Sequence, residues 1–315
     1  MKISASMIVK NEEEMLPACL ESIKWVDELI IVDTGSEDKT IEIAESFGAV
    51  VHTDYKWNDN FSEARNVSLS KCTGDWVLII DADEILEETE ETIRALLGHK
   101  FMQYKDAVMF RVNTGRETND QIRIFRNRED IEWSGAAHNL PHIRTEKGYK
   151  RIEDIHWSTL KVQSNFSPNH RVDPDRTLRI MTNELNKGPQ ALGQYQYTRY
   201  LYYVAREWLN RRDPIRGLYY LRDYVKLAPP TNELADAWFL IASCCIDLNR
   251  LEEAVDACLQ TVKYLPTYKA AWAILHNLAA PDNKKMWEKL YHMAKNEGVL
   301  FVRKEAEKLY KPEKK

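Results

Sequence analysis

The 315-residue chain has no long apolar run, few cysteines and no basic excess. No apolar run approaches the roughly 20 residues that a membrane-spanning helix needs, and the N-terminus lacks the basic and apolar segments of a signal peptide. The five cysteines form no C-x-x-C pair, and we expect them to be reduced. These absences predict a soluble protein with a cytoplasmic location.

Charge and composition narrow the class of protein further. The formal net charge is −5 and the pI is near 6.0, which removes the simplest electrostatic argument for a nucleic-acid binder. Hydrophobic residues make up 44% of the chain. A chain of this length and composition can form two globular domains with their own cores.

Two patterns divide the sequence. Up to about residue 160, short apolar runs alternate with helical patterns, which predicts βαβ units and a mostly parallel sheet in an α/β domain. From about Arg176 onward, glycine is scarce and aromatic and leucine residues recur at helical spacing, which predicts an all-α region. We expect an α/β domain at 1–165, a connecting helical segment at 166–196 and a helical domain at 197–315. The expected strands are 3–9, 28–33, 49–53 and 76–81, and the expected helices are 12–23, 39–47 and 62–71.

The helical region contains an internal repeat. Six positions recur at an offset of about 37 residues, with small residues where two helices cross and proline at the end of each unit. The first set is Leu201, Ala205, Trp208, Gly217, Leu221 and Pro229, and the second is Trp238, Ala242, Cys245, Ala254, Cys258 and Pro266. The pattern resembles tetratricopeptide repeats, with a partial third unit near Trp272. An ordinary helical bundle is the alternative.

The stretch "WVLIIDADE" ends an apolar run with Asp81, Asp83 and Glu84. In an open parallel sheet, ligands bind at the carboxyl ends of the strands. Two carboxylates two residues apart can bind one Mg²⁺ or Mn²⁺ that also bridges a diphosphate. The alternative is that Asp81 only caps a helix over residues 85–97.

Three segments together indicate a family. "SMIVKNEEEMLPACLESI", "ELIIVDTGSEDKTIEIAESFGA" and "NFSEARNVSLSKCTGDWVLIIDADE" resemble, in this order, the nucleotide-sugar-binding half of family 2 glycosyltransferases. The resemblance implies a GT-A (Rossmann-like) fold with a mixed, mostly parallel sheet. It also implies metal-dependent transfer of a sugar, usually from a UDP-sugar, with inversion at the anomeric carbon.

The same resemblance assigns the donor site. Asp33 ends a predicted strand and would accept a hydrogen bond from the imide N–H of uracil. Arg65 would contact the nucleotide or neutralise phosphate; otherwise it is solvated surface. Asp81 is assigned to the ribose and the metal-bound phosphate, and Asp83 to the metal. The loop that wraps base and ribose corresponds to Val9, Lys10, Asn11 and Glu12.

The acceptor half resembles a tetratricopeptide-bearing branch that includes bacterial peptide S- and O-glycosyltransferases and lipopolysaccharide-core glucosyltransferases. Relatives often carry Glu after the His of "W-x-G-x-x-H", whereas this chain has Asn139, which leaves the catalytic base open. The candidates for the base are Glu132, His138 and Asp154. His156 is a further candidate for the metal. Arg123 and Arg126 are expected to face one side of a strand and to hold the leaving diphosphate.

The sequence therefore predicts a hexosyltransferase that uses UDP-glucose or UDP-GlcNAc with Mg²⁺ or Mn²⁺. The acceptor is expected to be a hydroxyl or thiol on a peptide, protein or glycan, and the repeats are expected to form a homo-oligomer or to present the acceptor. Two alternatives stay open: transfer to modified bases in DNA, favoured by arginines of the first repeat, and a catalytically silent scaffold. A nucleotidyltransferase is disfavoured because "IVKNEEEML" has neither glycine nor a basic cluster.

Overall fold

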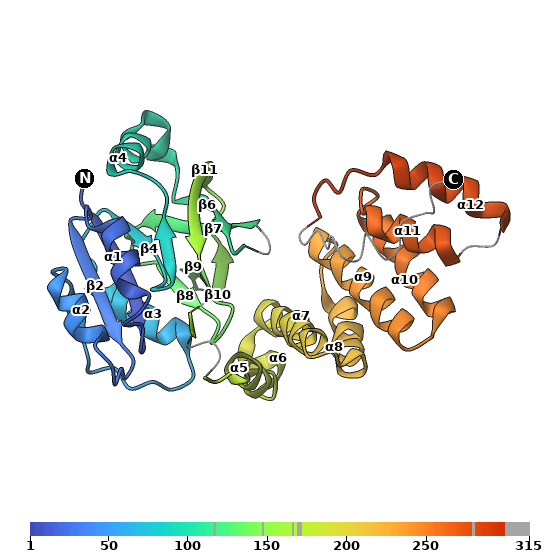
Figure 1. Cartoon of the computed structure of the whole chain (residues 1–315), viewed down its shortest axis with the longest axis horizontal. Coiled ribbons are helices and arrows are strands. Elements are labelled where there is room, and N and C mark those ends of the chain that lie inside the picture. Colours follow the sequence, from blue (N-terminus) through green and yellow to red (C-terminus); the bar gives the residue numbers. More distant parts are fainter. Residues whose placement is uncertain (116–117, 147, 166, 169–171, 279–280, 300–315) are drawn as a thin grey trace. The chain divides into compact units, whose positions relative to one another are not determined.

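The structure is a computed structural model that describes residues 1–115, 118–146, 148–165, 167–168, 172–278 and 281–299. The chain divides into two compact units, Met1–Ile180 and Met181–Lys315 (Figure 1). The strands are β1 (Ile3–Val9), β2 (Glu28–Asp33), β3 (Val50–His52), β4 (Trp76–Ile79), β5 (Glu84–Leu86), β6 (Ala107–Asn113), β7 (Thr118–Arg126), β8 (Ile131–Ser134), β9 (Leu140–Thr145), β10 (Gly148–Arg151) and β11 (Ile155–Ser164). The helices of the first unit are α1 (Leu16–Ile23), α2 (Thr40–Ser46), α3 (Phe61–Lys71), α4 (Glu90–Gly98) and the 3-10 helix η1 (Lys100–Tyr104), and α5 (Arg176–Leu185) crosses the division.

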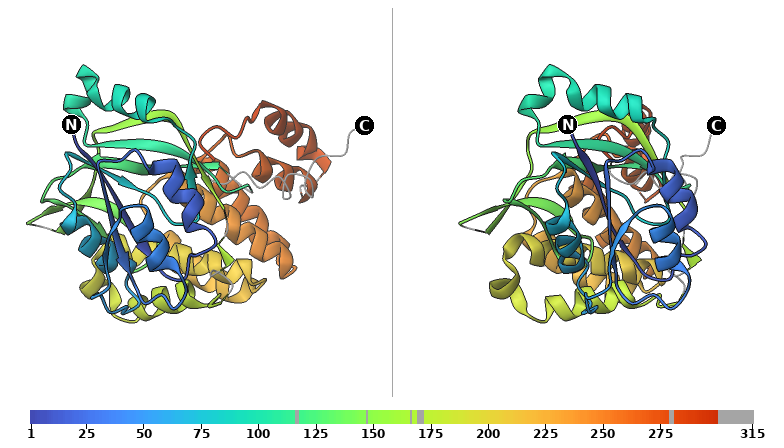
Figure 2. Two further views of the ribbon diagram at one scale, coloured as in Figure 1. Left: turned by 60° about the vertical axis from the view of Figure 1, so that its left-hand side comes forward. Right: turned by 90° about the vertical axis from the view of Figure 1, so that its left-hand side faces the viewer.

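An eight-stranded sheet in the order β3-β2-β1-β4-β7-β6-β11-β5 forms the first unit, and a separate antiparallel sheet has the order β10-β9-β8. Strands β3, β2, β1 and β4 are parallel, β7 runs antiparallel to both of its neighbours, and β11 is parallel to β6. The predicted mixed, mostly parallel α/β architecture is therefore confirmed. Helix α4 lies at one end of this unit, away from α2 and α3, in every view (Figures 1 and 2).

The apolar run of β4 is buried on both faces of the sheet. Trp76, Leu78 and Ile80 belong to one core cluster, whereas Val77 and Ile79 belong to another. Helix α1 supplies side chains to the first cluster, and α3 and β8 supply side chains to the second. Since successive residues of a strand face opposite sides, both faces require apolar side chains, and the run shows no polar alternation.

The chain after β4 differs from the prediction. The sequence predicts a helix over residues 85–97, but Glu84–Leu86 is strand β5, which pairs antiparallel with β11. Helix α4 begins only at Glu90, where the side chain of Thr89 accepts the N–H of Thr92. The interpretation of Asp81 as a helix cap is therefore wrong, because a strand separates it from the helix.

The second unit is helical, as predicted. Its helices are α6 (Gly188–Leu192), α7 (Gln194–Asn210), α8 (Pro214–Leu227), α9 (Asn232–Asp247), α10 (Leu251–Tyr264), α11 (Lys269–Leu278) and α12 (Pro281–Met293). The two predicted repeats correspond to the pairs α7–α8 and α9–α10, and the partial third to α11–α12. The small residues of the repeat are buried where paired helices pack; a Cβ atom on Gly217, for example, would collide with Leu209 of the preceding helix.

Two hydrogen-bonded groups lie inside this helical unit. The fully buried Asp236 accepts hydrogen bonds from the hydroxyls of Tyr202 (2.7 Å) and Tyr268 (2.8 Å). Tyr224 donates similarly to Glu233 at 2.8 Å. These contacts join α7 and α8 of one repeat to α9 of the next, and α9 to the residue before α11. The three tyrosines therefore belong to the core of the unit.

Two further expectations concern the chain as a whole. All five cysteines are free and buried, in agreement with the expectation that they are reduced. Over the described ranges, no helix combines the length and the apolar character required to cross a membrane.

Candidate active site

The carboxyl ends of β1 and β2 meet because Val9 lies opposite Asp33 in the parallel ladder. Asp33 is 4% exposed, and its Oδ2 accepts the main-chain N–H groups of Gly35 and Ser36, both at 2.9 Å. Gly35 has φ +107°, a conformation that favours glycine. Asp33 thus holds its own turn together, and a carboxylate with about four acceptor positions can do this and still accept a further N–H.

The loop after β1 is bonded to the turn after β2. Asn11 (φ 54°) donates its N–H to Ser36 Oγ at 2.9 Å, and its Oδ1 accepts the N–H of Glu37 at 2.7 Å. Glu12 donates its N–H to Thr40 Oγ1 at 2.7 Å. The residues predicted to wrap base and ribose are therefore held beside Asp33 by hydrogen bonds, while Lys10 presents an exposed side chain at the start of this loop.

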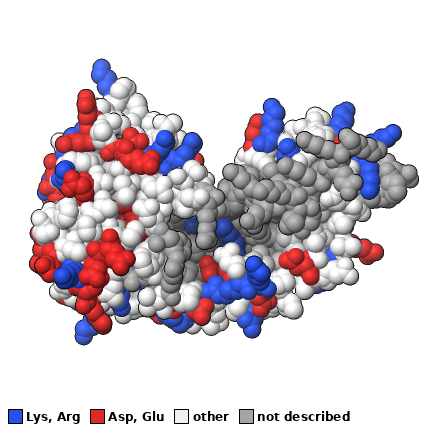
Figure 3. All heavy atoms as spheres, viewed as in Figure 1, with Lys and Arg blue, Asp and Glu red and all other residues white. Residues whose placement is uncertain are grey.

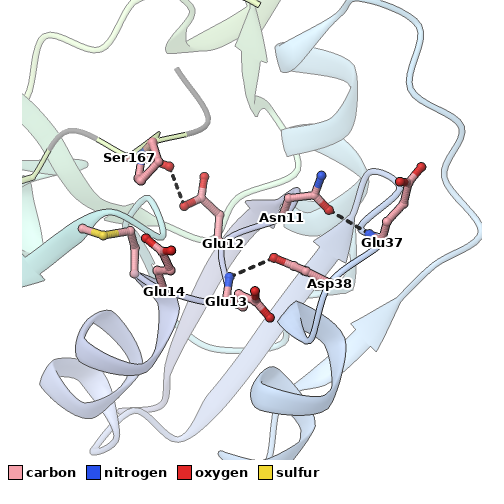
Figure 4. Close-up of a pocket in the computed structure, with 9 residues that line it drawn as sticks. Asn11, Glu12, Glu13, Glu14, Glu37, Asp38 and Ser167 are labelled. Atoms are coloured by element: carbon pink, nitrogen blue, oxygen red, sulfur yellow. Dashed lines mark hydrogen bonds between the residues drawn. The ribbon is translucent and has the colours of Figure 1, made fainter. Parts of the chain in front are cut away.

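A cavity of about 300 Å³ opens at this loop (Figure 4). Its lining is dominated by carboxylates, and Asp and Glu side chains also gather over the α1–α2 part of the unit in Figure 3. Such a lining repels phosphate. The lining residues are Asn11, Glu12, Glu13, Glu14, Met15, Glu37, Asp38, Ser167 and Pro168.

Asp81 follows the buried run of β4 and is held from two sides. Arg65 of α3 donates from Nη2 to Asp81 Oδ1 at 2.6 Å, and their side chains are 13% and 38% exposed. The main-chain N–H of Asp81 donates to Glu84 Oε2 at 2.9 Å. Arg65 and Asp81, each predicted separately to contact the nucleotide, therefore lie together at the carboxyl end of the sheet.

Asp83 is contacted by a segment that the sequence analysis missed. Ser167 donates its N–H to Asp83 Oδ2 at 3.2 Å. Its hydroxyl donates to Glu12 Oε2 at 2.9 Å (Figure 4). The main-chain N–H of Asn165 donates to the Asp83 carbonyl at 2.8 Å. No motif marks Ser167, because its position depends on the pairing of β11 with β5, which ends beside Asp83.

Glu84 and Arg123 form a buried ion pair beneath this turn, with exposures of 3% and 5%. Burial raises the pKa of Glu84 to about 7, although the positive charge of Arg123 acts to lower it. Arg123 also donates to Gln121 at 3.0 Å. The sequence predicts that Arg123 holds diphosphate, but its charge is already used by Glu84 inside the protein.

Arg126 does not share the position of Arg123. The register of β6 and β7 shifts at Arg123, which has no partner between the pairs Val108–Ile124 and Met109–Ile122, so regular strand alternation does not relate the two arginines. Arg126 lies opposite Trp76 at the amino end of β4, stacks on its ring at 4.4 Å, and donates to the carbonyls of Met102 (2.7 Å) and Lys105 (2.8 Å). The structure therefore does not bring Arg126 to the carboxylates.

Asp154 and His156 also lie elsewhere. The strand pairing places His156 level with Leu78 but on β11, three strands from β4, a lateral separation of about 14 Å. Its ring packs on Phe101 at 4.8 Å, and burial lowers its pKa. The Asp154 carbonyl accepts the N–H of Asp106 at 2.7 Å at the same edge. We therefore correct the assignment of Asp154 as a base and of His156 as a metal ligand.

The two remaining base candidates lie in β8 and in the turn that follows it. Glu132 alternates with Trp133, so it faces away from the core, where it accepts from Tyr149 at 2.6 Å and lies 3.8 Å from Arg144. This face is opposite to the one that meets Arg65. His138 is exposed, with φ 46°, in the turn whose carbonyl at Ala136 accepts the N–H that begins α3. Of the three candidates, His138 alone stays on the side of α3.

Comparison with known proteins identifies the first unit. Residues 4–155 match the model of "Glycosyl transferase family 2". The chain therefore carries a glycosyltransferase domain. The first unit thus matches the family that the sequence resemblance predicts for it.

Several known proteins are similar to this chain. A TPR repeat-containing protein of Synechococcus elongatus is 44% identical over 44% of this chain, and glycosyltransferase SunS of Bacillus subtilis is 30% identical over 44% of it. The matches cover 35% and 34% of these relatives, about a third of their length. A structure of S. aureus TarS 1-349 in complex with UDP-GlcNAc is 15% identical with a TM-score of 0.48, covering 96% of this chain and 93% of that one.

Proposed function

We propose that this chain is a metal-dependent, inverting glycosyltransferase that moves a hexose or N-acetylhexosamine from a nucleotide sugar, UDP-glucose or UDP-GlcNAc, to a hydroxyl or thiol acceptor. The observation that carries the proposal is the convergence of Asp33, the Arg65–Asp81 pair and Asp83 at the carboxyl ends of β2 and β4. Ligands of open α/β sheets bind at this edge, and the domain belongs to a family of glycosyltransferases.

The carboxylates fit a cation that is shared with the donor. Within the part of the chain that the structure describes, there is no group of three or more His, Cys, Asp or Glu side chains that could hold a metal ion. Mg²⁺ typically takes one or two carboxylates and completes its shell with water and substrate phosphates. Asp83, with Asp81 two residues before it, matches this arrangement. A divalent cation bound there would supply positive charge against the leaving diphosphate.

Each residue then has a role in a direct displacement. Asp33 and the loop from Val9 to Glu12 hold the uridine, and Arg65 fixes Asp81 beside the ribose and phosphate. His138 accepts the proton of the acceptor as its oxygen or sulfur attacks the anomeric carbon opposite the leaving group. For a thiol acceptor the requirement for a base is smaller, because thiolate is accessible near neutral pH.

The helical unit is proposed to present a peptide, protein or glycan acceptor, or to join two copies of the chain. Its arginines do not favour DNA, because most have partners within the same unit. Arg216 lies 3.6 Å from Asp213, Arg222 lies 2.7 Å from Glu253, and Arg211 pairs with Glu207 of its own helix. Paired charges contribute little to phosphate binding.

The test is a panel of UDP- and GDP-sugars with Mn²⁺ or Mg²⁺, in which the release of free nucleoside diphosphate is measured. We expect metal-dependent turnover of one donor and a loss of about 100-fold or more in Asp83→Ala, because charge neutralisation at the diphosphate contributes several kcal/mol. Asp75→Ala is the matched control, since Asp75 is an exposed carboxylate at the amino end of β4. Absence of both turnover and donor binding would refute the transferase and favour the silent scaffold.

A further inference from the structure

Trp133 of β8 is joined to α3 through its main chain and its ring. The side-chain amide of Asn66 binds its main chain on both sides, accepting the Trp133 N–H at 2.7 Å and donating to the Trp133 carbonyl at 2.9 Å. One turn earlier, Ser62 donates to the carbonyl of Gly135 at 2.6 Å. Several hydrogen bonds thus fix this segment of the chain against the first half of α3.

Arg65, the neighbour of Asn66 on α3, contacts the ring of the same tryptophan. The guanidinium carbon of Arg65 lies 4.9 Å from the centroid of the Trp133 ring, within the range of a cation–π contact. The Nη2 atom of the same guanidinium donates to Asp81 Oδ1. Taken with the C–N bond length, these distances put the indole centroid within about 9 Å of Asp81 Oδ1.

We propose that Trp133 is a positioning residue of the donor site, which holds the guanidinium of Arg65 in the orientation that pairs with Asp81. The inference rests on the proposed function, in which Asp81 binds ribose and phosphate. A long arginine side chain has several rotatable bonds, and without a flat surface beneath it the guanidinium samples other directions. The indole supplies that surface, and Asn66 fixes the indole's own main chain.

A role in packing alone is the competing explanation. Trp133 is 6% exposed and meets Phe125 edge-on at 6.3 Å within the core cluster between α3 and the sheet. Loss of the ring therefore also costs stability. A test must separate the effect that passes through Arg65 from the effect on packing.

The experiment is a double-mutant cycle on UDP binding, measured by calorimetry with Mn²⁺ on the full chain. Trp133→Leu, Arg65→Ala and the double variant are compared, after circular dichroism confirms that each is folded. Trp133→Leu is expected to weaken UDP binding by about 5- to 30-fold, the effect of a partly desolvated cation–π contact. In the Arg65→Ala background the same substitution is expected to change binding by less than 2-fold, roughly the limit of additivity.

Two further variants make the result independent of folding defects. Trp133→Phe keeps an aromatic face and is expected to bind UDP within about 5-fold of wild type, which a purely steric loss of the indole would not predict. Trp157→Leu removes a tryptophan that is 64% exposed on β11 and is expected to leave binding unchanged. Trp133→Phe therefore carries the test if Trp133→Leu does not fold.

Three outcomes are distinguishable. A loss in Trp133→Leu that disappears without Arg65 supports the positioning role. Equal losses with and without Arg65 overturn it and leave the transferase proposal standing. If wild type binds neither UDP nor a UDP-sugar, the proposed function fails, and the positioning role fails with it.

Discussion

The buried pair of Glu84 and Arg123 gives the sharpest prediction about the site. Substituting Arg123→Met removes the positive partner of the Glu84 carboxylate, which is 3% exposed and keeps the hydrogen bond from the Asp81 N–H. Breaking a buried ion pair from one side costs about 3–5 kcal/mol. We expect a loss of this size in the free energy of unfolding at pH 8, measured by urea denaturation.

The pH dependence has a definite sign. The pKa of Glu84 is about 7 in the folded chain and near 4.5 when unfolded, so the folded state binds this proton more tightly. Stability from this group therefore falls as pH rises from about 4.5 to above 7. Without Arg123 the folded pKa rises further, and the deficit of the variant should shrink towards pH 5, where Glu84 is neutral.

Two controls test the reasoning. Arg111→Met removes an exposed arginine, 3.6 Å from Asp120 and 52% exposed, and should cost less than about 1 kcal/mol. The double variant Glu84→Gln with Arg123→Met should recover part of the loss, because neither charge then remains buried. A cost below about 1 kcal/mol for Arg123→Met at pH 8, or no recovery in the double variant, would refute the buried pair.

Two other predictions concern stability and catalysis. Burial alone would raise the pKa of Glu28, but hydrogen bonds from Ser4, Thr73 and Lys2 lower it to about 2. Since only 16% of the Glu28 side chain is exposed, Glu28→Gln should lower the free energy of unfolding by about 3 kcal/mol at pH 7. Urea denaturation should show the difference between variant and wild type closing as pH falls from 4.5 to 2. His138→Ala should lower kcat of donor hydrolysis by about 10²–10⁴-fold with KM unchanged. The control His156→Ala should leave kcat unchanged. An unchanged kcat in His138→Ala would show that His138 is not the catalytic base.

The contrast between Arg65 and Arg123 shows where prediction from the sequence stops. Both are arginines near the carboxylate turn, and both are predicted to bind phosphate or nucleotide. Arg65 meets Asp81 at the surface of the turn, whereas Arg123 is enclosed with Glu84. The difference depends on which strand lies beside β4, and that strand is β7. The antiparallel pairing of β7 with β4 cannot be predicted from the spacing of residues along one strand.

The sequence alone determined the alternation of strands and helices, the helical repeats and the carboxylates at the ends of β2 and β4, because hydrophobic periodicity and strand-end position are local properties. The tertiary structure decided which distant side chains reach those carboxylates. It turned residues 84–86 into a strand, brought Ser167 to Asp83 through β11, placed His156 three strands away, and set Trp133 beneath Arg65. Those contacts join residues far apart in the chain, and strand order and register, which fix them, are set by the packing of the whole sheet.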